Sequence, residues 1–325
     1  MPAQIPRNYA TFQLNWLMFT KVVWHSHRVQ SGNQGQTIVK QPPRLLAGFE
    51  PFPGFRLKQL VGQGGFAEVW EATSPDGHSV ALKFMHVTDG INAGIEIRAL
   101  QSMQRLSHPK LLRIHHVWSL PAHVVISMDL ADGSLQEMLF ACLDEYGTPL
   151  PPAEACPYLS QAAEAIDFLN THQHVHDGKR VGYQHGDIKP SNLLIFGDTV
   201  KLADFGLAVP MSQARSTRMP VGTTQFAAPE IFQGSMSDQS DQYSLAVSYC
   251  LLRGGRVPFA DSPRSFQTQY TRPTPDLAML SENERPIIAR ALSPSPINRW
   301  PSCRAMMEAL TEVCHAPMPE MVSAR

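Results

Sequence analysis

The spacing of hydrophobic residues changes near residue 130, and this change restricts the folds that the chain can adopt. Before it, short apolar runs alternate with glycine-containing and polar turns, at 55–61, 69–70, 79–85 and 123–128. Runs of this length are typical of β-strands joined by hairpins. After Gly133 the apolar residues recur at helical spacing, and residues 243–252 are apolar on nearly every side, as in a buried helix. The pattern therefore predicts an α+β fold, with strands first and helices second.

Two lobes follow from this division. We expect a small N-lobe over residues 55–130, with a β-sheet and one helix over 91–106, and a larger helical C-lobe over residues 133–315. A cleft between two such lobes is the usual place for a ligand. Residues 1–54 read as an N-terminal extension that contains a flexible linker, the sequence S-G-N-Q-G-Q, and residues 316–325 read as a tail.

The composition excludes several classes of protein. Of the 325 residues 43% are hydrophobic and 17% are charged, which suffices for a sizeable core and is too little charge for a disordered chain. The formal charge of -1 argues against a nucleic-acid binder or a polybasic membrane binder. No apolar run reaches about 18 residues, so we expect no membrane span. The five cysteines are widely spread and odd in number, which argues against a disulfide framework or a zinc site and favours a cytoplasmic location.

A glycine cluster joins the first two predicted strands, in the sequence G-Q-G-G-F-A-E-V over residues 62–69. Glycine lets the backbone approach phosphate oxygens because no Cβ stands in the way. On its own, such a cluster is equally typical of a plain hairpin turn. Lys83 lies among apolar neighbours in the next strand, where a lysine that does not point to solvent needs an anionic partner. A phosphate, together with the carboxylate of Glu96 on the predicted helix, would supply that partner.

A second group of polar residues lies in the C-lobe, in the sequence H-G-D-I-K-P-S-N over residues 185–192. Phosphoryl transfer needs a carboxylate that orients the attacking hydroxyl and charges that neutralise the phosphate oxygens. Asp187 and Lys189 would present these two groups from one loop. Asn192, and Asp204 twelve residues later, add oxygen donors of the kind that Mg²⁺ prefers. Two such donors can hold the metal while nucleotide phosphates complete its coordination.

Taken in order along the chain, these motifs resemble those of the protein kinase superfamily, and within it the bacterial eukaryotic-like Ser/Thr kinases. The resemblance covers residues 55–315 and includes D-F-G at 204–206 and A-P-E at 228–230. It implies the bilobal kinase fold and transfer of the γ-phosphate of ATP to a Ser or Thr hydroxyl of protein substrates, with autophosphorylation. The implied cofactors are ATP and Mg²⁺, the implied partners are protein substrates, and no nucleic acid is expected. The oligomeric state stays open.

The resemblance also assigns roles to individual residues. It makes Asp187 the catalytic base, Lys189 the lysine that steadies the γ-phosphate, and Thr223 a hydrogen-bonding partner of both. Asn192 and Asp204 match the two magnesium ligands of the family.

Further positions match nucleotide-binding and structural residues of the family. Asp241 resembles the buried-helix aspartate that braces the catalytic loop, and Glu230 and Arg299 resemble the structural ion pair of the larger lobe. The implied nucleotide-binding positions comprise the glycine-rich loop, the strand lysine and its helix partner, the apolar adenine sandwich, and the gatekeeper and hinge: Val61, Gly62, Gln63, Gly64, Gly65, Phe66, Ala67, Val69, Ala81, Lys83, Glu96, Met128, Asp129, Ala131 and Leu194.

The chain departs from the family pattern before the catalytic aspartate, where Gly186 replaces the usual arginine. In most members that arginine binds a phosphate on the activation loop through charge-assisted hydrogen bonds. The replacement leads to the hypothesis that activity does not require phosphorylation of this loop. Ala67 replaces the third glycine of the glycine-rich loop, a position that commonly varies.

Two other functions stay open at this point. A small-molecule kinase of the aminoglycoside phosphotransferase type shares the H-G-D spelling and the following Asn192, but Lys189, D-F-G, A-P-E and Asp241 belong to the protein-kinase pattern. A catalytically weak pseudokinase-type scaffold would usually lack the strand lysine, the base or a metal ligand, and this chain has all of them.

Three histidines precede the catalytic loop, at His172, His174 and His176. Histidines at this spacing can bind a transition metal, but no cysteine and no carboxylate beyond Asp177 accompanies them. We therefore expect a solvated loop here rather than a metal site.

Overall fold

The computed structural model describes residues 45–64, 67–86, 97, 100, 104–120, 123–176, 178–205, 209–210, 223–260 and 270–315. Residues from Leu46 onward form one compact unit that includes both lobes. The predicted N-terminal extension lies almost wholly outside the described residues, and so does the tail. The domain boundaries proposed from the sequence therefore stay predictions.

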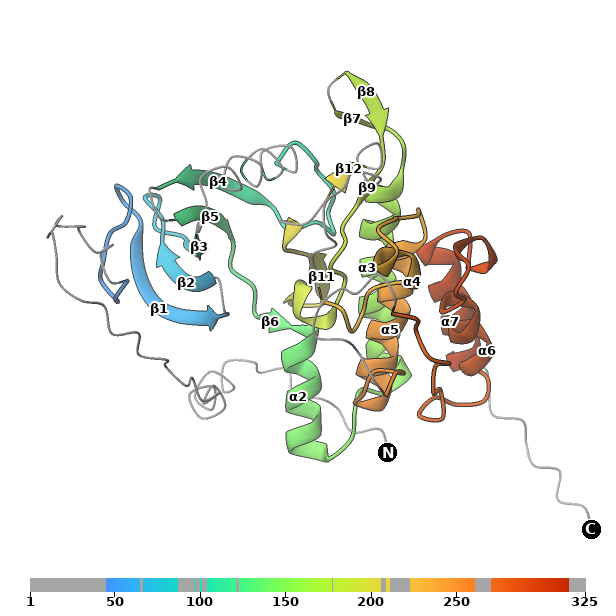
Figure 1. The fold of residues 1–325 in the computed structure, drawn as a ribbon. Helices are drawn as coiled ribbons and strands as arrows, with labels where there is room; N and C mark the ends of the chain where they lie inside the picture. Colours follow the sequence, from blue (N-terminus) through green and yellow to red (C-terminus); the bar gives the residue numbers. More distant parts are fainter. Residues whose placement is uncertain are drawn as a thin grey trace, which may run out of the picture. The chain divides into compact units, whose positions relative to one another are not determined.

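The N-lobe is built on a five-stranded antiparallel sheet with the strand order β1-β2-β3-β5-β4 (Figure 1). Its strands are β1 (Arg56–Gln63), β2 (Ala67–Thr73), β3 (Ser79–His86), β4 (Ile114–Ser119) and β5 (His123–Asp129). The glycine cluster joins β1 to β2, as the hairpin pattern predicts. The sequence did not predict β4, because two histidines interrupt its apolar pattern.

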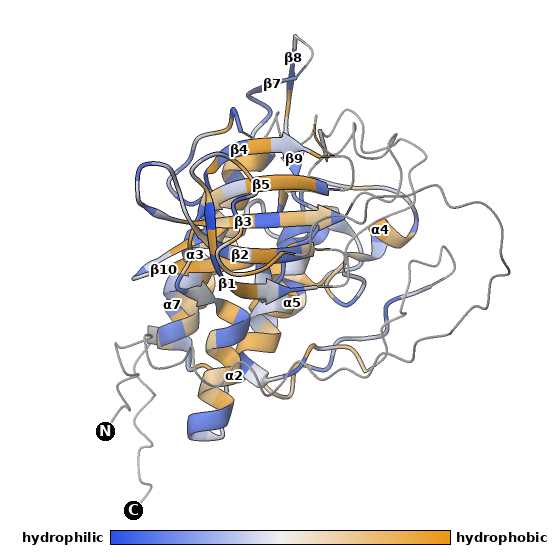
Figure 2. Ribbon diagram, turned by 90° about the vertical axis from the view of Figure 1, so that its left-hand side faces the viewer, coloured by the Kyte–Doolittle hydropathy of each residue, from blue (hydrophilic) through white to orange (hydrophobic). Residues whose placement is uncertain are grey.

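The central strands β3 and β5 are buried on both faces, and an apolar cluster lies on one face. Met85, Val124 and Ile126 are buried on it together with Leu100, and Ile97 packs against this group. Figure 2 shows β5 as hydrophobic along most of its length. Most of the predicted 91–106 helix lies outside the described residues, but Ile97 and Leu100 are both helical. These two helical residues therefore pack on this face of the sheet, and the bounds of the predicted helix stay a prediction.

The C-lobe consists mainly of helices. They are α2 (Leu135–Tyr146), α3 (Pro152–Asn170), α4 (Pro229–Phe232), α5 (Ser240–Gly254), α6 (Arg285–Ala291) and α7 (Cys303–His315). Helix α3 packs against α5 and α7 (Figure 1). Nearly every residue of α5 is buried, so it forms the centre of the lobe, as its apolar composition predicts. The expected α+β fold with a β-rich N-lobe and a helical C-lobe is confirmed.

Local signals set the ends of two helices. The Ser134 side chain accepts a hydrogen bond from the backbone of Glu137 while the Glu137 side chain bonds back, which forms a capping box at the start of α2. Gly147 and Gly255 end α2 and α5 in the left-handed conformation, with φ of 67° and 69°.

Backbone pairing in the C-lobe positions the site. Strands β6 (Gly133–Ser134), β10 (Leu193–Phe196) and β11 (Thr199–Leu202) form a small sheet in the order β11-β10-β6. Leu112, just before β4 of the N-lobe, donates its N–H to the carbonyl of Leu202 at 2.8 Å, and Leu202 donates to the carbonyl of Lys110 at 2.8 Å. The edge of β11 therefore joins the two lobes directly beside Asp204.

The stretch before the catalytic loop is a hairpin rather than an irregular loop, and most of its residues are exposed to solvent as expected. It contains a hairpin of β7 (His174–His176) and β8 (Lys179–Val181), which extends away from the helices (Figure 1). His174 is buried, and its ring contacts Phe168 edge-on while Nε2 lies 2.8 Å from the Phe168 carbonyl. Packing and hydrogen bonding thus occupy this histidine. No group of metal-binding side chains occurs among the described residues.

Strand β9 (Tyr183–Gln184) follows this hairpin and pairs with β12 (Val209–Pro210). Over the described part of the chain, no helix is both long and apolar enough to cross a bilayer.

Candidate active site

Lys83 reaches the C-lobe from β3. Its Nζ lies 2.8 Å from Oδ1 of Asp204, two residues after β11. The Lys83 side chain is 16% exposed and that of Asp204 is 41% exposed, so the carboxylate stays open to a further partner. Burial raises the pKa of Asp204, but the charge and hydrogen bond of Lys83 outweigh this effect and lower the pKa below its ordinary value.

The backbone of Asp204 is strained. Its φ is 66°, in the left-handed region that residues other than glycine rarely adopt. Strain of this kind costs on the order of 1–3 kcal/mol and clusters at functional sites. The surrounding hydrogen bonds hold Asp204 in this conformation: Ala203 donates its N–H to the Asn192 carbonyl at 2.9 Å and accepts from Nε2 of His185 at 2.9 Å.

The residues of the predicted catalytic loop contact one another. Oδ2 of Asp187 lies 2.7 Å from Nζ of Lys189, which donates to Oγ1 of Thr223 at 2.7 Å. The backbone N–H of Thr223 donates to Oδ1 of Asp187 at 2.9 Å. The Asp187 carboxylate is therefore held at both oxygens, and a cation lies beside it. The hydrogen bonds expected between Thr223 and both partners are present.

A buried aspartate of α5 braces this loop. Asp241 accepts the backbone N–H of His185 at 2.7 Å and that of Gly186 at 3.0 Å, so the expectation for Asp241 is confirmed. Burial raises the pKa of Asp241. Gly186 has a φ of 77°, a conformation that glycine adopts without a Cβ clash. A side chain at this position would therefore strain the loop.

The β10–β11 hairpin brings two oxygen donors together. Asn192 immediately precedes β10 and Asp204 follows β11, and the antiparallel pairing of Leu193 with Leu202 places their chain segments side by side. Nδ2 of Asn192 donates to the carbonyl and to Oδ2 of Asp187, at 2.8 Å and 3.1 Å. Its amide nitrogen is thus used within the loop, and its amide oxygen stays as an acceptor.

The donor chemistry of these residues fits a hard divalent cation. Carboxylate and amide oxygens are the ligands that Mg²⁺ prefers, and the metal usually takes its remaining ligands from phosphates and water. Asp204 keeps a low pKa and an exposed carboxylate, so it is available in its charged form.

The glycine-rich loop leaves room for a ligand. A Cβ added at Gly62 would come no closer than 3.6 Å to Val69, and one added at Gly64 no closer than 3.9 Å to the Ala67 carbonyl. Neither glycine has a φ in the left-handed region. The fold itself therefore does not require glycine here. The absence of a Cβ is consistent with a backbone that phosphate oxygens approach closely.

Most of the remaining predicted nucleotide-binding residues lie in strands of the N-lobe sheet, and Leu194 lies in the small sheet of the C-lobe. Val61 and Gln63 lie in β1, Ala67 and Val69 in β2, Ala81 in β3 and Leu194 in β10. Strand pairing sets Val69 opposite Lys83 and Ala81 opposite Met128. Three predicted residues lie outside the described residues: Gly65, Phe66 and Glu96. The expected Lys83–Glu96 pair therefore stays a prediction.

The predicted hinge carries a polar network, which includes an ion pair with Lys201, that the sequence did not suggest. Oδ1 of Asp129 lies 2.8 Å from Nε2 of His115 on β4, and Oδ2 lies 2.8 Å from Nζ of Lys201 on β11. Met128 precedes Asp129 in β5, and Ala131 follows it before β6. The side chain of Asp129 thus ties the sheet of the N-lobe to the C-lobe. Its partners are distant in sequence and carry no motif, so no pattern could have indicated them.

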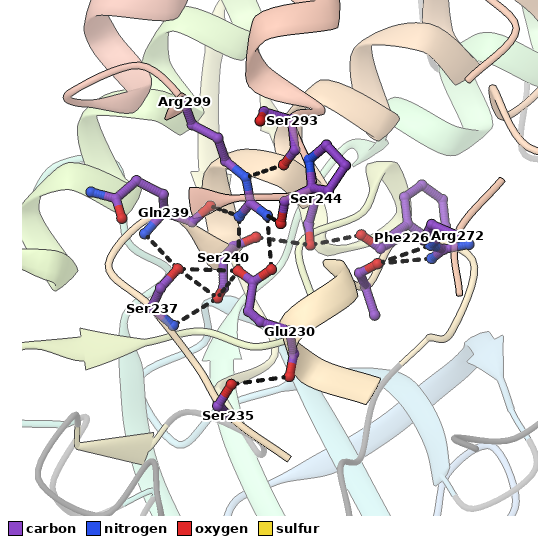
Figure 3. A network of polar contacts seen from close by, with 12 residues as sticks. Phe226, Glu230, Ser235, Ser237, Gln239, Ser240, Ser244, Arg272, Ser293 and Arg299 are labelled. Atoms are coloured by element: carbon purple, nitrogen blue, oxygen red, sulfur yellow. Dashed lines mark hydrogen bonds and ion pairs between the residues drawn. The ribbon is translucent and has the colours of Figure 1, made fainter. Parts of the chain in front are cut away.

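A second ion pair lies inside the C-lobe. The Arg299 guanidinium donates to both carboxylate oxygens of Glu230, at 2.8 Å and 2.7 Å, and Oε1 of Glu230 also accepts from the hydroxyls of Ser237 and Ser240 (Figure 3). Burial raises the pKa of Glu230, but the hydrogen bonds and charge of Arg299 outweigh it, so the net shift is downward. The structural pair expected from the sequence is confirmed.

Comparisons with known proteins agree with this geometry. A family model described as "Protein kinase domain" matches residues 55–314. CBL-interacting protein kinase 4 of Oryza sativa subsp. japonica is 30% identical over 268 residues, which cover 77% of this chain and 56% of the relative. Serine/threonine-protein kinase PknF of Mycobacterium tuberculosis is 29% identical over 287 residues, covering 82% and 57%. Serine/threonine-protein kinase PknD of the same species is 31% identical over 277 residues, covering 80% and 39%.

The chain spans about half the length of the curated relatives that it matches. The family model covers most of the chain, from the first strand of the N-lobe to the last helix of the C-lobe. The chain belongs to the protein kinase domain family.

Proposed function

We propose that this protein is an ATP- and Mg²⁺-dependent serine/threonine protein kinase that transfers the γ-phosphate of ATP to hydroxyl groups of protein substrates and to itself. One observation carries the proposal: a carboxylate, a lysine and a threonine lie in mutual contact beside the open carboxylate of Asp204. The free cysteines among the described residues suit a reducing compartment such as the cytoplasm.

On the acceptor side, Asp187 acts as the base. Its carboxylate accepts the proton of the attacking Ser or Thr hydroxyl and keeps that oxygen in line with the phosphorus atom. Lys189, 2.7 Å away, neutralises negative charge that develops on the transferred group. Thr223 fixes both residues, because its N–H bonds to the base and its hydroxyl accepts from the lysine.

On the nucleotide side, we assign phosphate binding to Lys83 and to the backbone of Gly62 and Gly64. Asp204 and Asn192 would hold Mg²⁺, which when bound neutralises phosphate charge and orients the terminal group. Val69, Ala81 and Leu194 would enclose the adenine, with hinge backbone from Met128 to Ala131 along its edge.

The loop conformation at Gly186 supports a second part of the proposal, that activity does not depend on phosphorylation of the activation loop. Gly186 carries no guanidinium that could bind such a phosphate, and its left-handed φ disfavours a side chain. Dephosphorylated and autophosphorylated protein should therefore show equal initial rates. A rise of about tenfold on phosphorylation, equivalent to about 1.4 kcal/mol, would refute this part.

Incubation with labelled ATP and Mg²⁺ tests the main proposal, with the Asp204→Asn protein as the control. We expect acid-stable label on Ser or Thr of the protein itself or of a generic protein substrate, and none with the variant. Label only on an aminoglycoside-like small molecule would show a small-molecule kinase instead. Nucleotide binding without transfer would show a pseudokinase-type scaffold.

A further inference from the structure

The segment after Thr223 is held by its backbone carbonyls. Ser244 of the central helix α5 donates its hydroxyl to the Phe226 carbonyl at 2.9 Å. Phe226 in turn donates its N–H to the Thr223 carbonyl at 3.0 Å, which closes a turn. This arrangement connects Thr223, which bonds to Asp187, to the core of the C-lobe.

Arg272 holds the same segment from the other side. Its Nη2 donates to the carbonyls of Thr224 and Ala227, the latter at 2.8 Å, and its Nε also donates to the Ala227 carbonyl, at 3.2 Å. Figure 3 shows the Arg272 side chain directed at this backbone next to Phe226. One planar guanidinium therefore bridges two carbonyls that are three residues apart, a geometry that suits arginine and not lysine.

Aromatic rings fix the position of this guanidinium. Its Cζ lies 4.7 Å from the ring centre of Phe259, 5.2 Å from that of Phe232 and 5.7 Å from that of Tyr270. A cation within about 6 Å of a ring face is attracted electrostatically by the ring. The rings thus hold the Arg272 side chain in place, so binding the segment costs little further side-chain entropy.

The connection to the reacting groups is short. Thr224, whose carbonyl Arg272 binds, directly follows Thr223, whose N–H bonds to Asp187 at 2.9 Å. A shift of the segment would move Thr223 away from both Asp187 and Lys189. Displacements of about 1 Å at such positions can cost on the order of 10²-fold in rate.

We propose that Arg272 is a positioning residue for the phosphate acceptor: it locks residues 223–227 so that the acceptor hydroxyl is presented to Asp187. This inference rests on the proposed kinase function. It predicts a selective defect on the acceptor side, because the segment bonds through Thr223 to Asp187 and Lys189, whereas on the nucleotide side Lys83 pairs with Asp204.

Steady-state kinetics of Arg272→Met and Arg272→Lys test the proposal. For Arg272→Met we expect the kcat/KM for a protein acceptor to fall about tenfold or more, while the KM for ATP changes less than about twofold. Arg272→Lys should recover only part of the loss, because an ammonium group cannot bridge both carbonyls. Arg256→Met is the matched control, since Arg256 pairs with the exposed Asp276 near the same loop and should keep wild-type kinetics.

Hydrogen–deuterium exchange separates this inference from the proposed function. The N–H of Phe226 should exchange faster in Arg272→Met than in the wild type and in Arg256→Met, whether or not phosphate is transferred. Equal exchange, or an ATP KM that rises as much as the acceptor KM, would overturn the role of Arg272. A wild-type protein that transfers no phosphate would refute the proposed function instead, and exchange alone would then decide whether Arg272 holds the segment.

Discussion

Two ion pairs of nearly equal length lie in very different surroundings. The Lys83–Asp204 pair is 2.8 Å long at the junction of the lobes, and the Glu230–Arg299 pair is 2.7 Å long inside the C-lobe. The side chain of Asp204 is 41% exposed, whereas those of Arg299 and Glu230 are 0% and 9% exposed. Arg299 also donates to the backbone carbonyls of Ser293 and Gln239, as Figure 3 shows.

In the Glu230–Arg299 network the charged groups have all their partners within the protein, whereas the Lys83–Asp204 pair can still accept a ligand. We call the first a completed network and the second an open one. Around Glu230 and Arg299, hydroxyl and carbonyl partners satisfy the charges inside the lobe, so removing one partner would leave a buried charge uncompensated. Asp204 instead keeps an exposed carboxylate next to a lysine, in a strained backbone conformation. Such an arrangement contributes little to folding and is suited to binding a cation and phosphates.

The largest effect should follow from removing the open carboxylate. Asp204→Asn should lower turnover by about 10³-fold or more, equivalent to about 4 kcal/mol, because the amide loses the charge that holds the metal. Unfolding in urea should remain close to that of the wild type. Asp198→Asn, which alters an exposed carboxylate in the β10–β11 turn, is the control. Near-normal turnover of Asp204→Asn would contradict the metal assignment.

Breaking the completed network should affect stability instead. Arg299→Met should lower the free energy of unfolding by about 3–5 kcal/mol, because it leaves the Glu230 carboxylate buried without its cation. Lys83→Met should lower it by less than about 1 kcal/mol, since solvent reaches Asp204. Denaturant titration of both variants measures the contrast. Equal destabilisation by the two substitutions would remove the distinction between the networks.

The sequence predicted both partners of the Glu230–Arg299 pair, but for Lys83 it predicted a different partner from the one described. Glu230, Arg299 and Asp241 carry motif positions, so their contacts could be predicted from resemblance. For Lys83 the sequence indicated a need for an anionic partner and named Glu96, whereas the described contact is with Asp204. Both partners fit the same chemical need, and charge pattern alone does not rank them.

Other parts of the fold gave weaker signals. The hairpin β7–β8 has strands of three residues each, too short for a detectable alternation of apolar and polar residues. Arg272 binds backbone carbonyls, which every residue possesses, so the sequence does not indicate which residues it contacts. Asp129 pairs with residues 14 and 72 positions away, and only the folded strands bring them together.

A third carboxylate, Glu284, allows the contribution of a paired buried acid to stability to be measured as a function of pH. Burial raises the pKa of Glu284, but hydrogen bonds from Arg253, Tyr249 and Ser281 outweigh it and lower the pKa from 4.5 to about 2. A lowered pKa in the folded state means that the stabilisation is complete above pH 4.5 and is lost as the pH falls toward 2. We expect a loss of roughly 2–3 kcal/mol of unfolding free energy over this range. Glu284→Gln should flatten this part of the pH profile, and an unchanged slope would contradict the assignment.

The smallest effect concerns two buried serines. Ser240 is 3% exposed and donates to Glu230 at 2.7 Å, whereas Ser127 of β5 is 1% exposed and its hydroxyl has no hydrogen-bond partner among the described residues. An unpaired buried hydroxyl costs free energy, so Ser127→Ala should be neutral or stabilise the protein by up to about 1 kcal/mol. Ser240→Ala should destabilise it by about 1–2 kcal/mol, because it removes a donor from a charged acceptor. Thermal unfolding of the two variants compares a satisfied with an unsatisfied hydroxyl at equal burial. A loss of stability in Ser127→Ala would mean that the Ser127 hydroxyl has a hydrogen-bond partner. The buried hydroxyls of β5 and of the Glu230 network would then not differ in hydrogen bonding.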